Sequence, residues 1–137
     1  MRIMSQSTTD RIVLAAVDDI FFSAKIEEVA KRVGVRLIQA LDAGQLSEKL
    51  AASTPELIIL DLNSRACSPL DAIRRIKSDP KFRDTPVLGF FSHVQVELEQ
   101  AALQAGCDHV VPRSKFSANL PEILGKPHPG RRREDRS

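Results

Sequence analysis

Residues 57–61 read Leu-Ile-Ile-Leu-Asp, a run of four branched apolar side chains that ends at a carboxylate. Such a short continuous run is typical of a strand buried on both faces of a parallel sheet, because both of its faces must be apolar. A second run of this kind covers residues 12–17 and is followed by Asp18 and Asp19. The two runs predict an α/β fold with carboxylates at the ends of its strands.

Helix and strand patterns alternate on both sides of these runs. Phe22, Ile26, Val29 and Val33 lie at helical spacing, and Gly34 follows where the end of a helix is expected. Five strands that alternate with helices predict a parallel sheet with helical crossovers. The other expected elements are strands at 35–40, 86–91 and 110–111 and helices around 46–50, 69–78, 96–105 and 120–124.

One helix start carries a specific local signal. Ser68 precedes Pro69, a residue favoured at the first helical position, and Asp71 follows three residues after the serine. This spacing predicts that the Ser68 side chain caps the helix and that Asp71 completes a capping box.

Polar residues follow several of the expected strands. In an open parallel sheet the functional site lies beyond the carboxyl ends of the strands. Two unit charges about 4 Å apart repel by roughly 4 kcal/mol at an effective dielectric of about 20, so clustered carboxylates favour a bound proton or cation. Mg²⁺ is the natural candidate, because it takes carboxylate and phosphate oxygens as ligands. The residues expected on this rim are Asp18, Asp19, Asp61, Ser92, His93 and Arg113.

A simpler interpretation exists for part of this rim. Asp is a preferred helix cap, so Asp18 or Asp19 alone is explained by capping the helix that follows the first strand. Capping does not account for a third carboxylate, Asp61, at the end of a different strand. Both interpretations stay open for the acidic pair.

Composition and charge exclude several classes of function. The net charge is +2, but five basic and two acidic residues give residues 126–137 a charge of +3, which leaves −1 for residues 1–125. A nucleic-acid-binding domain usually gathers basic residues on its folded faces, so nucleic acid is not an expected partner. No apolar run reaches the roughly 18 residues of a membrane span. Two cysteines without metal-ligand spacing favour reduced thiols and a cytoplasmic location.

The ends of the chain differ in composition from its centre. Residues 1–10 are polar, and residues 126–137 contain several prolines and an arginine run. We expect a disordered N-terminus, one folded domain over residues 11–125, and a basic disordered tail.

Five segments, in order and at matching spacing, resemble the receiver domain of two-component response regulators. They are Val17-Asp18-Asp19, residues 57–63, residues 72–77, Thr85-Pro86-Val87-Leu88 and Ala105-Gly106-Cys107-Asp108. The resemblance covers residues 11–125. It implies a flavodoxin-like five-stranded parallel sheet of order 2-1-3-4-5 with helices on both faces.

The resemblance also implies a role for each rim residue. Asp61 holds the position of the aspartate that accepts a phosphoryl group from a histidine kinase. Asp18, Asp19 and Asn63, together with Asp61, hold the positions that bind Mg²⁺. The implied function is a stand-alone signalling module of a phosphorelay, with output through contact with another signalling protein and no enzymatic turnover.

Other positions depart from the receiver pattern. Receivers carry Thr or Ser at the end of the fourth strand, where Phe91 falls here, with Ser92 one place later. Arg113 replaces the usual lysine after the fifth strand, and Val110 replaces the aromatic switch residue. We therefore expect an atypical receiver or pseudo-receiver, in which Ser92 and Arg113 are the candidates to contact a phosphoryl group.

Two alternatives remain beside this reading. The first alternative is a docking domain that is not phosphorylated and whose acidic residues are remnants. The second is a small Mg²⁺-dependent phosphohydrolase. The phosphohydrolase is disfavoured because the chain has little room for a substrate domain. The sequence leaves the oligomeric state open.

Overall fold

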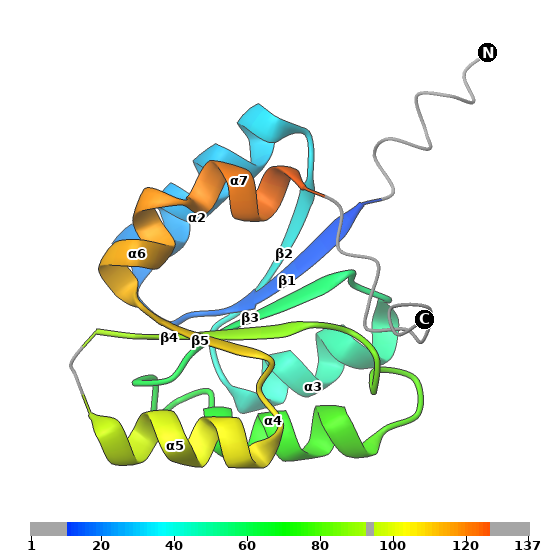
Figure 1. The fold of residues 1–137 in the computed structure, drawn as a ribbon. Coiled ribbons are helices and arrows are strands. Elements are labelled where there is room, and N and C mark those ends of the chain that lie inside the picture. Colours follow the sequence, from blue (N-terminus) through cyan, green and yellow to red (C-terminus); the bar gives the residue numbers. More distant parts are fainter. Residues whose placement is uncertain (1–10, 93–94, 127–137) are drawn as a thin grey trace, which may run out of the picture.

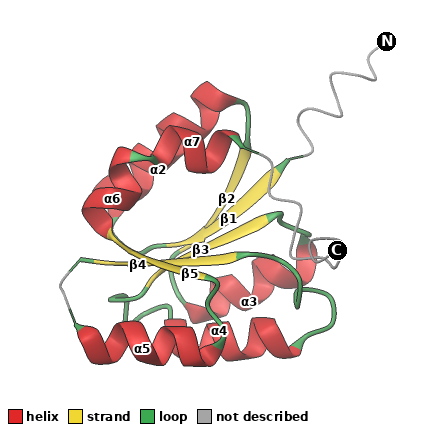
Figure 2. Cartoon of the chain, viewed as in Figure 1, coloured by secondary structure: helices red, strands yellow, loops and turns green. Residues whose placement is uncertain are grey.

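The computed structural model describes residues 11–92 and 95–126. Apart from Lys126, both predicted disordered ends lie outside the described residues, and so does His93. In the described part, strands and helices alternate along the chain (Figures 1 and 2). The strands are β1 (Ile12–Ala16), β2 (Arg36–Ala40), β3 (Leu57–Asp61), β4 (Val87–Phe91) and β5 (His109–Pro112). The helices are α2 (Ile20–Val33), α3 (Ala43–Ala52), α4 (Pro69–Ser78), α5 (Val96–Ala105), α6 (Arg113–Ala118) and α7 (Leu120–Gly125).

The strands form one parallel sheet of order β2-β1-β3-β4-β5, which confirms the predicted topology. β1 and β3 are neighbours, with Ala16 opposite Leu60, and Asp61 lies opposite Phe90 of β4. The residues that follow β1, β3 and β4 are therefore brought to the same edge of the sheet.

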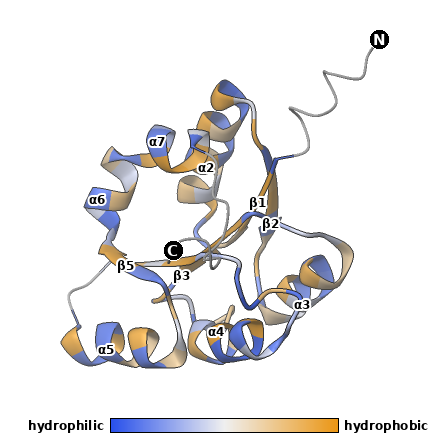
Figure 3. Cartoon of the chain, turned by 45° about the vertical axis from the view of Figure 1, so that its right-hand side comes forward, coloured by the Kyte–Doolittle hydropathy of each residue, from blue (hydrophilic) through white to orange (hydrophobic). Residues whose placement is uncertain are grey.

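Helices cover both faces of the sheet. α2, α6 and α7 lie on one face, and α3, α4 and α5 lie on the other (Figure 1). Hydrophobic and hydrophilic residues alternate along these helices (Figure 3), and their buried apolar residues belong to the two cores that flank the sheet. Every residue of β3 is buried, and its side chains alternate between the two cores, with Ile59 facing α2 and Ile58 facing α4. This double burial is the physical reason for the continuous apolar run in the sequence.

Three phenylalanines join the sheet to the helices above it. Phe90 of β4 stacks on Phe116 of α6, with ring centroids 4.8 Å apart and planes at 8°. Phe22 of α2 meets Phe90 edge-on at 5.3 Å and Phe116 at 5.9 Å. Such aromatic pairs add about 0.5–1.5 kcal/mol each beyond the area they bury. This aromatic cluster fixes the ends of α2 and α6 beside the carboxyl edge of the sheet.

One local prediction was wrong, and one helix was not predicted. Ser68 has a left-handed backbone (φ 47°) and makes no side-chain cap bond, although α4 does begin at Pro69 as expected. Residues 113–118, for which the sequence analysis predicted no element, form α6. No helix in the described part of the chain has the length and apolar character needed to cross a membrane.

Candidate functional site

Asp61 is the most deeply buried acidic residue among residues 11–92 and 95–126, with 6% of its surface exposed. It ends β3, and its Oδ1 accepts a hydrogen bond of 3.0 Å from the backbone N–H of Asn63. Burial raises the pKa of Asp61, and the charges of Asp18 and Asp19 add to that effect. The Asn63 N–H and the charge of Arg113 oppose it. The structure therefore keeps a carboxylate where ionisation is unfavourable.

Asp19 is bound on both of its oxygens. Oδ1 accepts the N–H of Phe22 at 3.1 Å and so caps α2, which confirms the capping interpretation for this residue. Oδ2 forms an ion pair of 3.1 Å with Nη2 of Arg113. The Phe22 N–H bond lowers the pKa of Asp19, and the Arg113 guanidinium lowers it further. Asp19 is thus held ionised and oriented.

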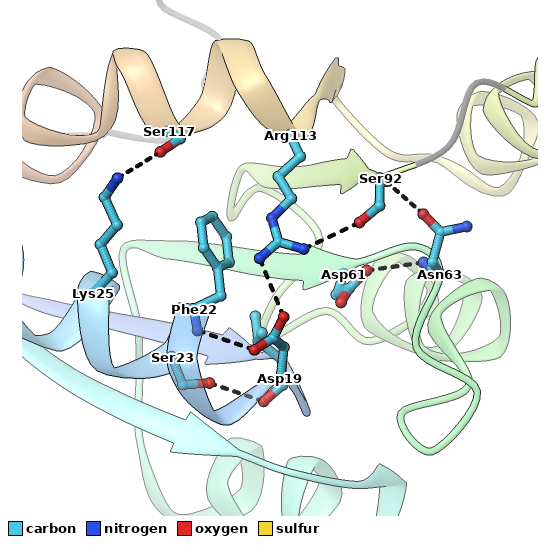
Figure 4. A network of polar contacts seen from close by, with 10 residues as sticks. Asp19, Phe22, Ser23, Lys25, Asp61, Asn63, Ser92, Arg113 and Ser117 are labelled. Carbon is cyan, nitrogen blue, oxygen red and sulfur yellow. Dashed lines mark hydrogen bonds and ion pairs between the residues drawn. The ribbon is translucent and has the colours of Figure 1, made fainter.

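Arg113 is the hub of the rim (Figure 4). It is the first residue of α6 and follows β5 directly. Nη2 of its guanidinium donates to Asp19, and Nη1 donates to the hydroxyl of Ser92 over 3.3 Å. The same guanidinium lies over the ring of Phe22, 4.0 Å from the ring centroid. The cation–π contact and the ion pair together fix the planar guanidinium in place. A lysine could not make the same set of contacts, because its ammonium group is not planar.

Asp18 has a different partner, which the sequence analysis missed. The hydroxyl of Ser64 donates to Oδ2 of Asp18 at 2.9 Å and accepts the N–H of Cys67 at 3.2 Å. Ser64 is 2% exposed, and its own N–H donates to the Asp61 carbonyl, so a tight turn carries it back toward β1. The signal available in the sequence was a serine three residues after the strand-end aspartate.

Asn63 connects two loops of the rim. Its Oδ1 accepts the backbone N–H of Ser92 at 2.6 Å, and its Nδ2 donates to Oε1 of Gln95 at 3.3 Å. Both Asn63 and Ser92 therefore lie at the predicted edge. The amide of Asn63 ties the loop after β3 to the segment after β4.

The three carboxylates that were predicted to bind Mg²⁺ lie at one edge of the sheet. Asp18, Asp19 and Asp61 affect one another's charge, but each has its own hydrogen-bond partner. Among the described residues, no group of three or more Asp, Glu, His or Cys side chains is placed to hold a metal ion. The oxygen ligands suit Mg²⁺ chemically. Their arrangement does not fit the ion, because Arg113 occupies Asp19.

The two switch positions lie in regular structure. The pairing of β3 with β4 runs in regular register through Gly89 and Phe90, without a bulge. Phe91 is buried, with 8% of its surface exposed, and lies opposite Pro112. Val110 lies opposite Gly89 and packs against the core under α3, α4 and α5. The hydroxyl at the end of β4 is therefore that of Ser92, one residue beyond the strand.

The two cysteines take no part in the rim chemistry. Both are unpaired and buried. Burial raises the pKa of Cys67, and it raises that of Cys107 to about 11. Both thiols are therefore protonated and unreactive at neutral pH.

No family model matches the sequence, and no curated protein matches it. Solved structures match the fold over most of the chain. A response regulator from Hahella chejuensis is 19% identical with a TM-score of 0.76, covering 83% of this chain and 92% of that one. The chemotaxis response regulator CheY4 of Vibrio cholerae is 19% identical with a TM-score of 0.75, covering 85% and 97%. The fold is that of a receiver domain.

Another solved structure of a receiver domain contains a magnesium ion. The receiver domain of the sensor histidine kinase PA1611 from Pseudomonas aeruginosa is 20% identical with a TM-score of 0.74, covering 85% of this chain and 95% of that one. Its structure has a magnesium ion coordinated in the active-site cleft.

The raised pKa of Asp61 leads to a prediction about stability. The folded state holds this proton more tightly than the unfolded state, so stability falls as pH rises through the window from the unfolded pKa to the folded one. Replacing Asp61 by Asn should therefore raise the free energy of unfolding at neutral pH by about 1 kcal/mol. The gain should vanish below about pH 4, where the aspartate is protonated in both states. Chemical denaturation across pH measures this difference.

Glu48→Gln provides the matched control, because it removes an exposed carboxylate from α3. We expect it to change stability by less than about 0.5 kcal/mol at any pH. A destabilised Asp61→Asn variant at neutral pH would show that the ionised carboxylate is structurally favourable, contrary to this account.

Proposed function

We propose that the chain is a receiver-like signalling module in which Asp61 accepts a phosphoryl group and the output is a protein–protein contact. The observation that carries the proposal is the burial of Asp61 at the carboxyl end of a central strand. A buried carboxylate that accepts one hydrogen bond, from the Asn63 N–H, reduces stability, so packing alone gives no reason for its presence. A chemical role for the carboxylate would explain why it is kept at that position.

The rim supplies the groups that phosphoryl transfer needs. An oxygen of Asp61 forms the new O–P bond as the P–N or P–O bond of the donor breaks, and the bonding electron pair leaves with the donor. The Asn63 N–H holds one carboxylate oxygen in place. Ser92 and Arg113 are the nearby groups that donate hydrogen bonds, and both are expected to contact the transferred group. Charge stabilisation of this kind is the main contribution of a protein to phosphoryl transfer.

The expected donor is a histidine kinase or another phosphorelay protein, on the strength of the receiver resemblance. Asp18, Asp19, Asp61 and Asn63 hold the positions that bind Mg²⁺ in receivers, but Asp19 is paired with Arg113 in this chain. For Asp19 to serve as a ligand, Arg113 must first release it. The proposal includes no enzymatic turnover of a separate substrate.

Incubation with acetyl phosphate tests the proposal directly. The wild-type chain should gain the mass of one phosphoryl group, with the modified residue identified as Asp61 by borohydride reduction and peptide mass spectrometry. Asp61→Asn should lose the label entirely, while Asp71→Asn, which changes an exposed carboxylate on α4, should keep it. Label on another residue, or none with acetyl phosphate or a kinase, would favour the unphosphorylated docking domain.

A further inference from the structure

The carboxyl edge of the sheet already contains a cation of its own. The Arg113 guanidinium is in direct contact with Asp19, and its charge also acts on Asp61. The two contacting side chains are only about one-third exposed, at 33% for Arg113 and 36% for Asp19. Partial burial of this kind reduces the screening of a charge pair by water and salt.

The guanidinium is held by several contacts rather than by the ion pair alone. One face lies over Phe22, and Nη1 donates to Ser92 while Nη2 binds Asp19. Phe22 itself is fixed by its contacts with Phe90 and Phe116 in the core. The Asp19 side chain is fixed by capping α2 on the same turn that carries Phe22. These contacts therefore fix both the position and the orientation of the Arg113 guanidinium.

The contacts of Arg113 occupy the Asp19 carboxylate, which a divalent ion would need as a ligand. Asp19 has one oxygen on the Phe22 N–H and the other on Arg113. Asp18 and Asp61 remain, and no group of three acidic, histidine or cysteine side chains in the described residues is placed to hold a metal. A divalent ion that enters must displace Arg113 or accept its positive charge as a neighbour, and the second option is unfavourable.

We propose that Arg113 is the resident cation of the rim and keeps divalent metal from Asp19, so that the site is maintained without Mg²⁺. The inference rests on the proposed function, because it concerns the same rim, but it concerns metal binding and not phosphoryl transfer. Arg113 neutralises the carboxylates while Asp61 is unmodified, and it is already beside Ser92 when a phosphoryl group arrives.

The test is Mg²⁺ binding by calorimetry, with no phosphodonor present. In Arg113→Gln the affinity for Mg²⁺ should rise at least about tenfold over the wild type, since the loss of one positive charge relieves its repulsion of the ion. Arg36→Gln is the matched control, because it removes an exposed arginine at the start of β2, away from this rim. Its affinity should equal that of the wild type. Asp19→Asn in the Arg113→Gln background should abolish the gain, while Asn still caps α2.

Arg113→Met provides a second variant in case Arg113→Gln folds poorly, because its apolar chain continues to cover Phe22 without a charge. It should show the same rise in affinity. Equal Mg²⁺ affinity in the wild type and both Arg113 variants would overturn the inference, as would the same rise in Arg36→Gln. Because acetyl phosphate labelling of Asp61 is a separate measurement, failure of this inference and failure of the proposed function are distinguishable.

Discussion

Replacing Phe90 by alanine should lower the free energy of unfolding by about 3–5 kcal/mol, the usual cost of emptying a buried aromatic position. Phe90 is fully buried, stacks on Phe116 and meets Phe22 edge-on. It therefore joins β4 to both α2 and α6. Domains have a total stability of only about 5–15 kcal/mol, so this loss is a large fraction of the total. Urea denaturation followed by circular dichroism measures the change.

Phe21→Ala is the matched control for this substitution. Phe21 precedes Phe22 on α2 and is 89% exposed, so its removal should change stability by less than about 0.5 kcal/mol. A loss of under about 1 kcal/mol in Phe90→Ala would mean that the aromatic cluster is not the support of the rim that we describe.

The parts of the fold that were predictable carry strong local patterns. The run at residues 57–61 is apolar on both faces because β3 is buried on both faces, and the residues of α2 alternate at helical spacing because one side of α2 covers the sheet. α6 was missed because Phe116 is its only buried residue. A single apolar residue does not produce the repeated helical spacing from which a helix is predicted. This short helix is stabilised by tertiary contacts of Phe116 with Phe22 and Phe90.

The site was predictable in its place but not in its pairings. Chain order and strand ends were enough to bring Asp19, Asp61 and Arg113 to one edge of the sheet. The partner of each carboxylate depends on contacts between distant segments: Arg113 and Asp19 are 94 positions apart, and Ser64 and Asp18 are 46 apart. The same limit applies to Ser68, whose backbone follows the path of the loop and not its local capping signal.

The second large effect concerns the coupling between the rim and the surface of the domain. Phe91 is buried in a regular strand, at the position where receivers carry Thr or Ser. Its side chain has no hydroxyl and no other hydrogen-bond donor, so it cannot bind a phosphoryl group and move toward it. Val110 is too small to act as the aromatic switch of ordinary receivers. Modification of Asp61 should therefore leave the backbone of β5 and α5 almost unchanged. Beryllium fluoride, a mimic of the phosphoryl group, makes this measurable by NMR.

The most direct test of the central claim, that the chain keeps a phosphoryl-accepting Asp61 but lacks the usual switch, is this beryllium fluoride titration of the wild-type chain, with Asp61→Asn as the control. We predict saturable backbone shifts at Asp61, Asn63, Ser92 and Arg113, small shifts along α5 and β5, and no response in the control. Strong shifts across α5 and β5 would show that the switch is intact. The absence of any shift at Asp61 would contradict its role as the acceptor.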